Sequence, residues 1–183
     1  ADGVSHLIEA LLSAHDAVVR VCPEGLVLRP QPVGQAGAVG LRELAVETGR
    51  GILTLRLETS RGKVEQVRVN MGRPILTSAE IPTTLPGDPP VNAALAVGSL
   101  SFEVTCVSMG NPHAVIFVDD LASVDLGSEG PEIEQLPIFP RRMNVHFVQV
   151  ISASEVNVLH WERGTGRTLA CGTGACAVGV AGV

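Results

Sequence analysis

Short stretches in which apolar and polar residues alternate are the feature that most limits the folds open to this chain. Residues 51–58 have the sequence GILTLRLE and residues 63–72 have KVEQVRVNMG, with Ser60, Arg61 and Gly62 between them. Alternation with a period of two places the apolar side chains on one face of a strand. The pattern therefore predicts two strands joined as a β-hairpin.

The second half of the chain repeats this pattern. We expect strands at 99–110 and 113–120, and a second hairpin from 143–152 and 155–163, followed by a Gly-rich turn and an apolar helix. In the first half, residues 5–20 have the spacing of a short amphipathic helix. Together these elements predict an α+β fold with two pseudo-symmetric lobes, each of mostly antiparallel sheet with one helix, and a cleft between the lobes.

A Pro-rich segment, IPTTLPGDPPV at 81–91, is expected to connect the two lobes. We therefore assign residues 1–80 to an N-terminal lobe and residues 81–183 to a C-terminal lobe. Residues 30–40 are rich in Pro, Gly and Gln and are expected to form a loop. The final apolar run stops within a helical pattern, so we expect the C-terminal lobe to be truncated at its end.

Composition narrows the classes of function. Hydrophobic residues make up 45% of the 183 residues, which favours a packed core, and the net charge of −6 disfavours a nucleic-acid partner. No apolar run reaches the ~20 residues that span a bilayer, and the basic start of a signal peptide is not seen. We expect a cytoplasmic protein that binds a small amino-acid substrate, does not bind a membrane, and is compatible with a homodimer.

The four cysteines do not form a zinc motif or a secreted disulfide pattern. Cys22, Cys106, Cys171 and Cys176 include no CxxC pair, so we predict reduced thiols and no metal site. Cys106 lies in an apolar strand and Cys176 in an apolar helix, where buried, inert thiols are expected. No neighbouring charge is positioned to activate Cys22.

The segment 161–177, WERGTGRTLACGTGACA, is the strongest candidate site. It lacks the third glycine of a dinucleotide loop and the Gly-Lys-Ser/Thr of a phosphate loop. Its small residues could simply allow close packing of a helix start. Alternatively, a helix that begins near Gly172–Gly174 presents N–H groups with no intrahelical acceptor, which would bind a carboxylate and favour a thiolate at Cys171. Glu162 and Arg163, at the end of a strand, could then hold an ammonium group and a second carboxylate.

Several separated motifs resemble the diaminopimelate epimerase family. They are ERGTGRTLACGTGACA at 162–177, MGNPHAV at 109–115 and RMNVHFVQV at 142–150, supported by ETGRGILTLRL and VRVNMGRPIL in the first half, so that the similarity covers residues 41–183. The resemblance implies an isomerase that interconverts LL- and meso-diaminopimelate, for lysine and peptidoglycan precursor biosynthesis, without pyridoxal phosphate or any other cofactor. One cysteine thiolate of that family removes the α-proton and a second cysteine's thiol delivers a proton to the opposite face.

The resemblance also implies roles for individual residues of this chain. It makes Cys171 one acid/base, with His113 and Glu162 as further catalytic residues. It assigns substrate binding to Asn111, Asn144, Glu162 and Arg163, and to the N–H groups of Gly172 and Thr173, which would hold the reacting α-carboxylate. From the residues alone, His113 could be a polar loop residue, and the two asparagines could be turn residues.

The family's other cysteine, in a Met-Cys-Gly-Asn-Gly type block, has no counterpart in the sequence. Three further interpretations therefore remain open at this point. The chain could be a related proline-type racemase, a hydrolase that uses Cys171 and His113, or a binding module that keeps the fold without both thiols.

Overall fold

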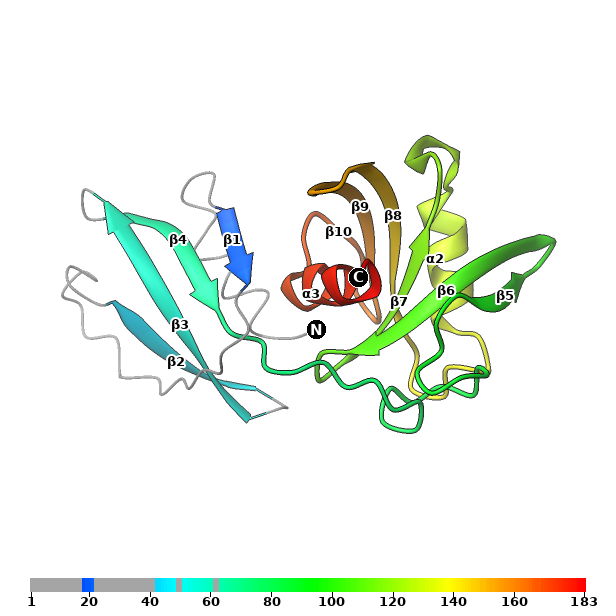
Figure 1. Ribbon diagram of the computed structural model, residues 1–183, viewed down its shortest axis with the longest axis horizontal. Coiled ribbons are helices and arrows are strands. Elements are labelled where there is room, and N and C mark those ends of the chain that lie inside the picture. The colour runs from blue at the N-terminus through cyan, green and yellow to red at the C-terminus, as the bar shows by residue number, and fades with distance from the viewer. Residues whose placement is uncertain (1–17, 22–41, 49–50, 61–62) are drawn as a thin grey trace. The chain divides into compact units, whose positions relative to one another are not determined.

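A computed structural model of the chain describes residues 18–21, 42–48, 51–60 and 63–183 (Figure 1). Contacts within the chain divide it into two compact units, with the boundary between Arg73 and Pro74. This boundary precedes the division at residues 80 and 81 that we assigned from the sequence. The Pro-rich segment 81–91 contains no helix or strand, and it lies within the second unit.

The first unit contains a four-stranded sheet. Its strands are β1 (Val18–Val21), β2 (Glu43–Thr48), β3 (Gly51–Ser60) and β4 (Lys63–Val69), in the spatial order β1-β4-β3-β2. The expected hairpin is confirmed, because β3 and β4 pair in antiparallel register, whereas β1 pairs with β4 in parallel. Leu55, Leu57, Val67 and Val69 are buried, as their alternating positions predict.

The predicted helix over 5–20 is wrong at residues 18–20, which belong to strand β1. Val18, Val19 and Val21 are β-branched and favour a strand once a neighbouring strand offers hydrogen bonds. The rest of that predicted helix lies outside the described residues, as does the predicted loop at 30–40.

The second unit contains a six-stranded mixed sheet. Its strands are β5 (Ala93–Val97), β6 (Leu100–Ser108), β7 (Pro112–Phe117), β8 (Asn144–Ser152), β9 (Glu155–Glu162) and β10 (Gly166–Thr168), in the order β10-β9-β8-β7-β6-β5. All neighbours pair in antiparallel register except β7 and β8, which are parallel. The hairpin expected from 143–152 and 155–163 is confirmed as β8 and β9.

Two α-helices cover opposite faces of this sheet (Figure 1). Helix α2 (Leu126–Glu134), preceded by the short 3₁₀ turn η1 (Leu121–Ser123), lies in the connection between the parallel strands β7 and β8. Helix α3 (Gly172–Ala181) follows β10 and contacts β6, β7 and β8. The apolar helix after the Gly-rich turn is therefore confirmed, whereas α2, β5 and β10 were not predicted. Within the described residues, neither helix has the length and apolar character needed to cross a bilayer.

Strand alternation gives the two faces of the sheet different chemistry. The face toward α2 forms the apolar core, which includes Val104, Cys106, Ala114, Ile116, Val145 and Phe147 packed with Leu126 and Ile133 of α2. The residues between these positions point to the α3 face. On β7, β8 and β9 that face carries buried polar side chains: His113, Asn144, His146, His160 and Glu162. The second unit is therefore an α+β structure in which the face of the sheet that is covered by α3 is polar.

Packing of α2 against β9 depends on the glycine at position 130. A methyl group on Gly130 would lie 2.6 Å from Cδ2 of Trp161, well inside contact distance. We predict that Gly130→Ala lowers the free energy of unfolding by about 1–3 kcal/mol, because the indole is held in place and the helix must shift. Urea unfolding measures the change.

Gly127→Ala in the same helix is the matched control. Its added methyl group meets Asp125 Oδ1 at an ordinary 3.5 Å. Because alanine favours a helix over glycine, this variant should be neutral or gain up to about 1 kcal/mol. Equal destabilisation by the two variants would contradict the proposed packing.

Candidate active site

Cys171 occupies the N-cap position of helix α3, three residues after Thr168, the last residue of strand β10. Its backbone is extended (φ −138°, ψ 108°), and its Sγ accepts a hydrogen bond from the N–H of Gly174 at 3.3 Å. The side chain is 2% exposed. A cap of this kind satisfies one of the N–H groups that have no acceptor at the start of a helix. The thiol is therefore placed where the helix dipole favours negative charge.

A chain of hydrogen bonds connects this sulfur to the loop before β7. The hydroxyl of Thr173 lies 3.5 Å from Cys171 Sγ and accepts a hydrogen bond from Asn111 Nδ2 at 3.2 Å. Asn111 Oδ1 in turn lies 2.9 Å from His113 Nε2. The structure thus brings together four of the residues predicted from the sequence, from segments some 60 positions apart in the chain.

The chain of contacts continues through two histidines that the sequence analysis did not select. His113 Nδ1 lies 2.8 Å from His146 Nε2, and His146 Nδ1 lies 2.8 Å from His160 Nδ1. These three side chains lie on adjacent strands β7, β8 and β9. His113 and His146 are completely buried and His160 is 8% exposed.

Burial keeps these imidazoles neutral. Loss of hydration lowers the pKa of His113 from 6.5 to about 3, with further lowering by the charges of Arg163 and His160. Burial, together with the neighbouring His113 and His160, lowers the pKa of His146 well below 6.5. Burial also lowers the pKa of His160 to about 4. At neutral pH each ring therefore carries a single N–H.

Asn144 fixes the loops on both sides of the site. Its Nδ2 donates to the carbonyl of Pro112 at 2.8 Å, and its Oδ1 accepts from the backbone N–H of Arg163 at 3.0 Å. Both ends of the amide thus hold backbone groups, and the side chain is 3% exposed. Asn144 therefore sets the positions of the segment with Asn111 and of the segment with Arg163.

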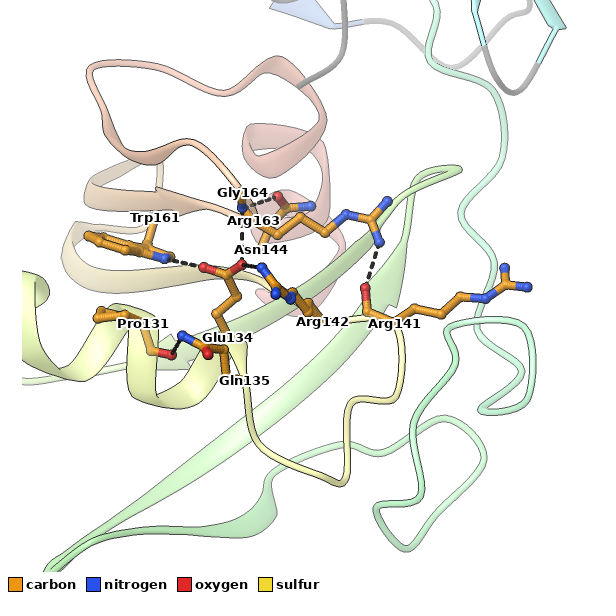
Figure 2. A network of polar contacts seen from close by, with 9 residues as sticks. All are labelled: Pro131, Glu134, Gln135, Arg141, Arg142, Asn144, Trp161, Arg163 and Gly164. Atoms are coloured by element: carbon orange, nitrogen blue, oxygen red, sulfur yellow. Dashed lines mark hydrogen bonds and ion pairs between the residues drawn. The ribbon is translucent and has the colours of Figure 1, made fainter.

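A buried carboxylate, Glu134 at the end of α2, holds the turn after β9 from the other side of the sheet (Figure 2). Its Oε2 accepts from Trp161 Nε1 at 2.7 Å, and its Oε1 accepts from the N–H of Gly164 at 3.0 Å and from Arg142 at 3.4 Å. The Arg163 guanidinium, in the same turn, donates to the carbonyl of Arg141 at 3.0 Å. The Glu-Arg-Gly segment is thus tied to its surroundings on both sides.

The structure locates every residue predicted for the site, all of them in the second unit. Cys171, Gly172 and Thr173 start helix α3, whereas Glu162 ends β9 and is 9% exposed. Sequence reasoning missed His146, His160 and Glu134. Period-two alternation could have found the two histidines, since His146 lies two residues after Asn144 and His160 two residues before Glu162.

The other described cysteines lie outside this network. The expected burial of Cys106 is confirmed, since it is 0% exposed, and this burial raises the pKa of its thiol to about 12. Burial, reinforced by the neighbouring Cys171, raises the pKa of Cys176 to about 11. Cys22 lies outside the described residues. Among the residues that the structure describes, no group of His, Cys, Asp and Glu side chains is arranged to hold a metal ion.

Comparison with known proteins confirms the resemblance. The family model described as diaminopimelate epimerase matches residues 105–183, which include the whole candidate site. The chain is 46% identical over 173 residues to a diaminopimelate epimerase of Desulfitobacterium hafniense, covering 94% of this chain and 61% of the relative. This chain belongs to the diaminopimelate epimerase family.

Two further relatives show the extent of the match. A diaminopimelate epimerase of Moorella thermoacetica is 44% identical over 162 residues, covering 88% of this chain and 58% of the relative. One of Methanothermobacter thermautotrophicus is 41% identical over 183 residues, covering 100% of this chain and 64% of the relative. The chain thus spans about three fifths of the length of these epimerases.

Glu134 should contribute strongly to stability. We predict that Glu134→Ala lowers the free energy of unfolding by about 1–3 kcal/mol, because the buried Glu134 carboxylate is the acceptor for the indole N–H of Trp161 and the backbone N–H of Gly164. Chemical denaturation provides the measurement. Glu132→Ala, an exposed position on the same helix, is the control and should change stability by no more than about 0.5 kcal/mol. Comparable losses in the two variants would refute the role of Glu134.

The three neutral histidines should make the protein sensitive to acid. Their pKa values are lower in the folded protein than in the unfolded chain, so the unfolded chain binds more protons below pH 6.5. Stability should therefore fall as the pH falls from about 6.5 to about 4, by up to about 1.4 kcal/mol per pH unit for each histidine. Unfolding measured across this range should show a slope that is about one proton smaller in His160→Phe. An unchanged slope would contradict the assignment.

Proposed function

We propose that this chain is part of a cofactor-independent diaminopimelate epimerase, in which the Cys171 thiolate exchanges the proton on the α-carbon of LL- or meso-diaminopimelate. The observation that carries this proposal is the environment of the sulfur. Cys171 Sγ is buried, caps helix α3 and accepts the N–H of Gly174. The relatives named as diaminopimelate epimerases supply the substrate class.

The chemistry requires stabilisation of a carbanion-like transition state. The α-proton of an amino acid is a very weak acid, so a base alone is insufficient, and charge developing toward the carboxylate must be stabilised by donors already in place. The N–H groups of Gly172 and Thr173, in the first turn of α3, have no intrahelical acceptors. We assign the reacting α-carboxylate to these groups, next to the thiolate that removes the proton.

The other predicted residues hold and orient the substrate in this proposal. Glu162, at the end of β9, is suited to an ammonium group, and Arg163 to the distal carboxylate. Asn111 lies beside Thr173, and Asn144 holds the backbone of Arg163. His113 acts on Cys171 through Asn111 and Thr173 rather than by direct contact.

The competing enzyme classes fit the geometry less well. A cysteine hydrolase needs a histidine that takes the proton from its sulfur. Here the two ring nitrogens of His113 are occupied by Asn111 and His146. A proline-type racemase would share the thiol and the helix start, but the relatives reported above are diaminopimelate epimerases. Epimerisation also requires a second thiol on the opposite face of the α-carbon, and we place that thiol outside the described residues.

We predict that Cys171→Ala in the full-length protein abolishes the interconversion of LL- and meso-diaminopimelate. Removing the base eliminates proton abstraction on its face and, with it, inversion. Cys176→Ala, five residues further along the same helix, is the control. It should retain activity within a few-fold and cost about 1 kcal/mol of stability, since its thiol is a packing group.

Proton NMR of the substrate in D₂O follows the exchange, and a coupled assay follows the inversion. Full inversion by Cys171→Ala would overturn the assignment of the base. If Cys176→Ala loses activity and Cys171→Ala keeps it, the reacting thiol is that of Cys176 and not that of Cys171.

A further inference from the structure

Three imidazoles form an unbroken row across the α3 face of the second sheet. His113 on β7 lies two residues before Val115, the pairing partner of His146 on β8, and His146 pairs directly with His160 on β9. The ring centroids of the first pair are 5.1 Å apart with planes at 30°, and those of the second pair are 4.9 Å apart with planes at 74°. Each pair also places two nitrogens 2.8 Å apart.

A contact between two neutral imidazole nitrogens holds one hydrogen atom, so the tautomers of neighbouring rings are coupled. Asn111 Oδ1 is an acceptor, which requires His113 to carry its hydrogen on Nε2. His113 Nδ1 is then an acceptor, and His146 must donate from Nε2. His146 Nδ1 becomes an acceptor in turn, and His160 must donate from Nδ1.

The donor-to-acceptor direction of these hydrogen bonds continues from Asn111 to Cys171. Asn111 Nδ2 donates to Thr173 Oγ1, which leaves the single hydroxyl hydrogen of Thr173 available for Cys171 Sγ. The N–H of Gly174 is a second donor to this sulfur. Every donor from His160 onward thus points toward Cys171. Successive hydrogen bonds of one direction polarise and strengthen one another in a buried setting, and two donors on a sulfur favour its thiolate form.

The row cannot carry protons from end to end. The amide of Asn111 separates His113 from Thr173, and an amide N–H does not ionise under these conditions. A proton wire would also need a ring that takes up a second proton, whereas burial lowers the pKa of all three histidines far below neutrality. The row of imidazoles is therefore suited to orienting hydrogen-bond dipoles and not to transferring protons.

Helix α3 holds the middle ring in place. A methyl group on Gly174 would lie 2.5 Å from Cε1 and 2.8 Å from Nε2 of His146, so only glycine allows the helix start to pack this closely on the ring. Gly174 is also the residue whose N–H binds Cys171 Sγ. The position of the His146 ring and the position of the sulfur are thus set by the same turn of helix.

We propose that His146 and His160 are positioning residues that fix His113 in its Nε2–H tautomer and thereby direct a chain of hydrogen-bond donors at the Cys171 sulfur. This deepens, and rests on, the base role proposed above for Cys171. The two residues do not touch the substrate in this arrangement. They act through His113, Asn111 and Thr173.

Tautomer assignment by ¹H–¹⁵N NMR of the imidazole rings tests the proposal in the full-length protein at pH 7. We expect the hydrogen on Nε2 of His113, on Nε2 of His146 and on Nδ1 of His160. The opposite set, with the hydrogen on Nδ1 of His113, would mean that the donors point away from Cys171 and would overturn the proposal. This measurement needs no variant and no activity.

Variants at position 146 separate positioning from packing. A glutamine side chain can donate from its amide nitrogen and accept with its oxygen, as the neutral His146 ring does, whereas leucine can do neither. We expect His146→Leu to leave His113 as a mixture of tautomers and to lower kcat about tenfold with little change in KM. His146→Gln should keep the Nε2–H tautomer and remain within about threefold of the parent kcat.

His160→Phe removes only the last donor and should show a smaller loss of kcat in the same direction, which provides a second variant if His146→Leu does not fold. Leu159→Val is the control, because Leu159 is adjacent to His160 but packs on the opposite, apolar face. It should alter stability alone. An unchanged His113 tautomer and unchanged kcat in both His146→Leu and His160→Phe would assign these histidines a structural role only.

Failure of the proposed function gives a different result. In that case the parent protein would not exchange the α-proton of diaminopimelate, whatever its tautomers. The expected tautomers, together with slower alkylation of Cys171 in His146→Leu than in His146→Gln, would then still support the positioning chain.

Discussion

Parallel pairing of β7 and β8 is the constraint on which the rest of the site depends. It places His113 beside Asn144 and requires a long connection, which supplies helix α2 as the cover of the apolar face. The opposite face is then left for helix α3 and for the polar side chains. Because β9 continues the sheet beyond β8, His160 and Glu162 join the same face. One pairing thus separates an apolar core from a polar site.

The site is built from buried polar groups, and such groups are tolerated only when they are hydrogen-bonded. Asn144 satisfies two backbone groups, Glu134 satisfies the indole of Trp161 and the N–H of Gly164, and the imidazoles satisfy one another. A single substitution in such a network leaves a partner unpaired. Because any other arrangement would leave buried polar groups unpaired at a cost in free energy, the network holds the site in one geometry.

Cys171 differs from the other described thiols through its surroundings rather than its burial. Cys106 is equally inaccessible, but it lies among apolar side chains of the core, and burial raises its pKa to about 12. Cys171 instead has hydrogen-bond donors from the first turn of α3 and from Thr173. The difference follows from the side of the sheet on which each sulfur lies, and it supports the proposal that Cys171 serves as a base.

The sequence by itself determined the hairpins, the helix after the Gly-rich turn, the placement of Cys171 at its start and, through motifs, the family. These features depend on local periodicity, turn residues and short-range spacing, which a sequence displays directly. It gave no indication of α2 or β10, and the helix predicted at 5–20 was wrong over 18–20, where strand pairing overrides a helical spacing. Only the tertiary structure decided that His146, His160 and Glu134 belong with the site. His113 is 33 residues from His146, His160 is 14 residues from His146, and Trp161 is 27 residues from Glu134, and contacts at such separations are set by strand register and helix packing rather than by local pattern.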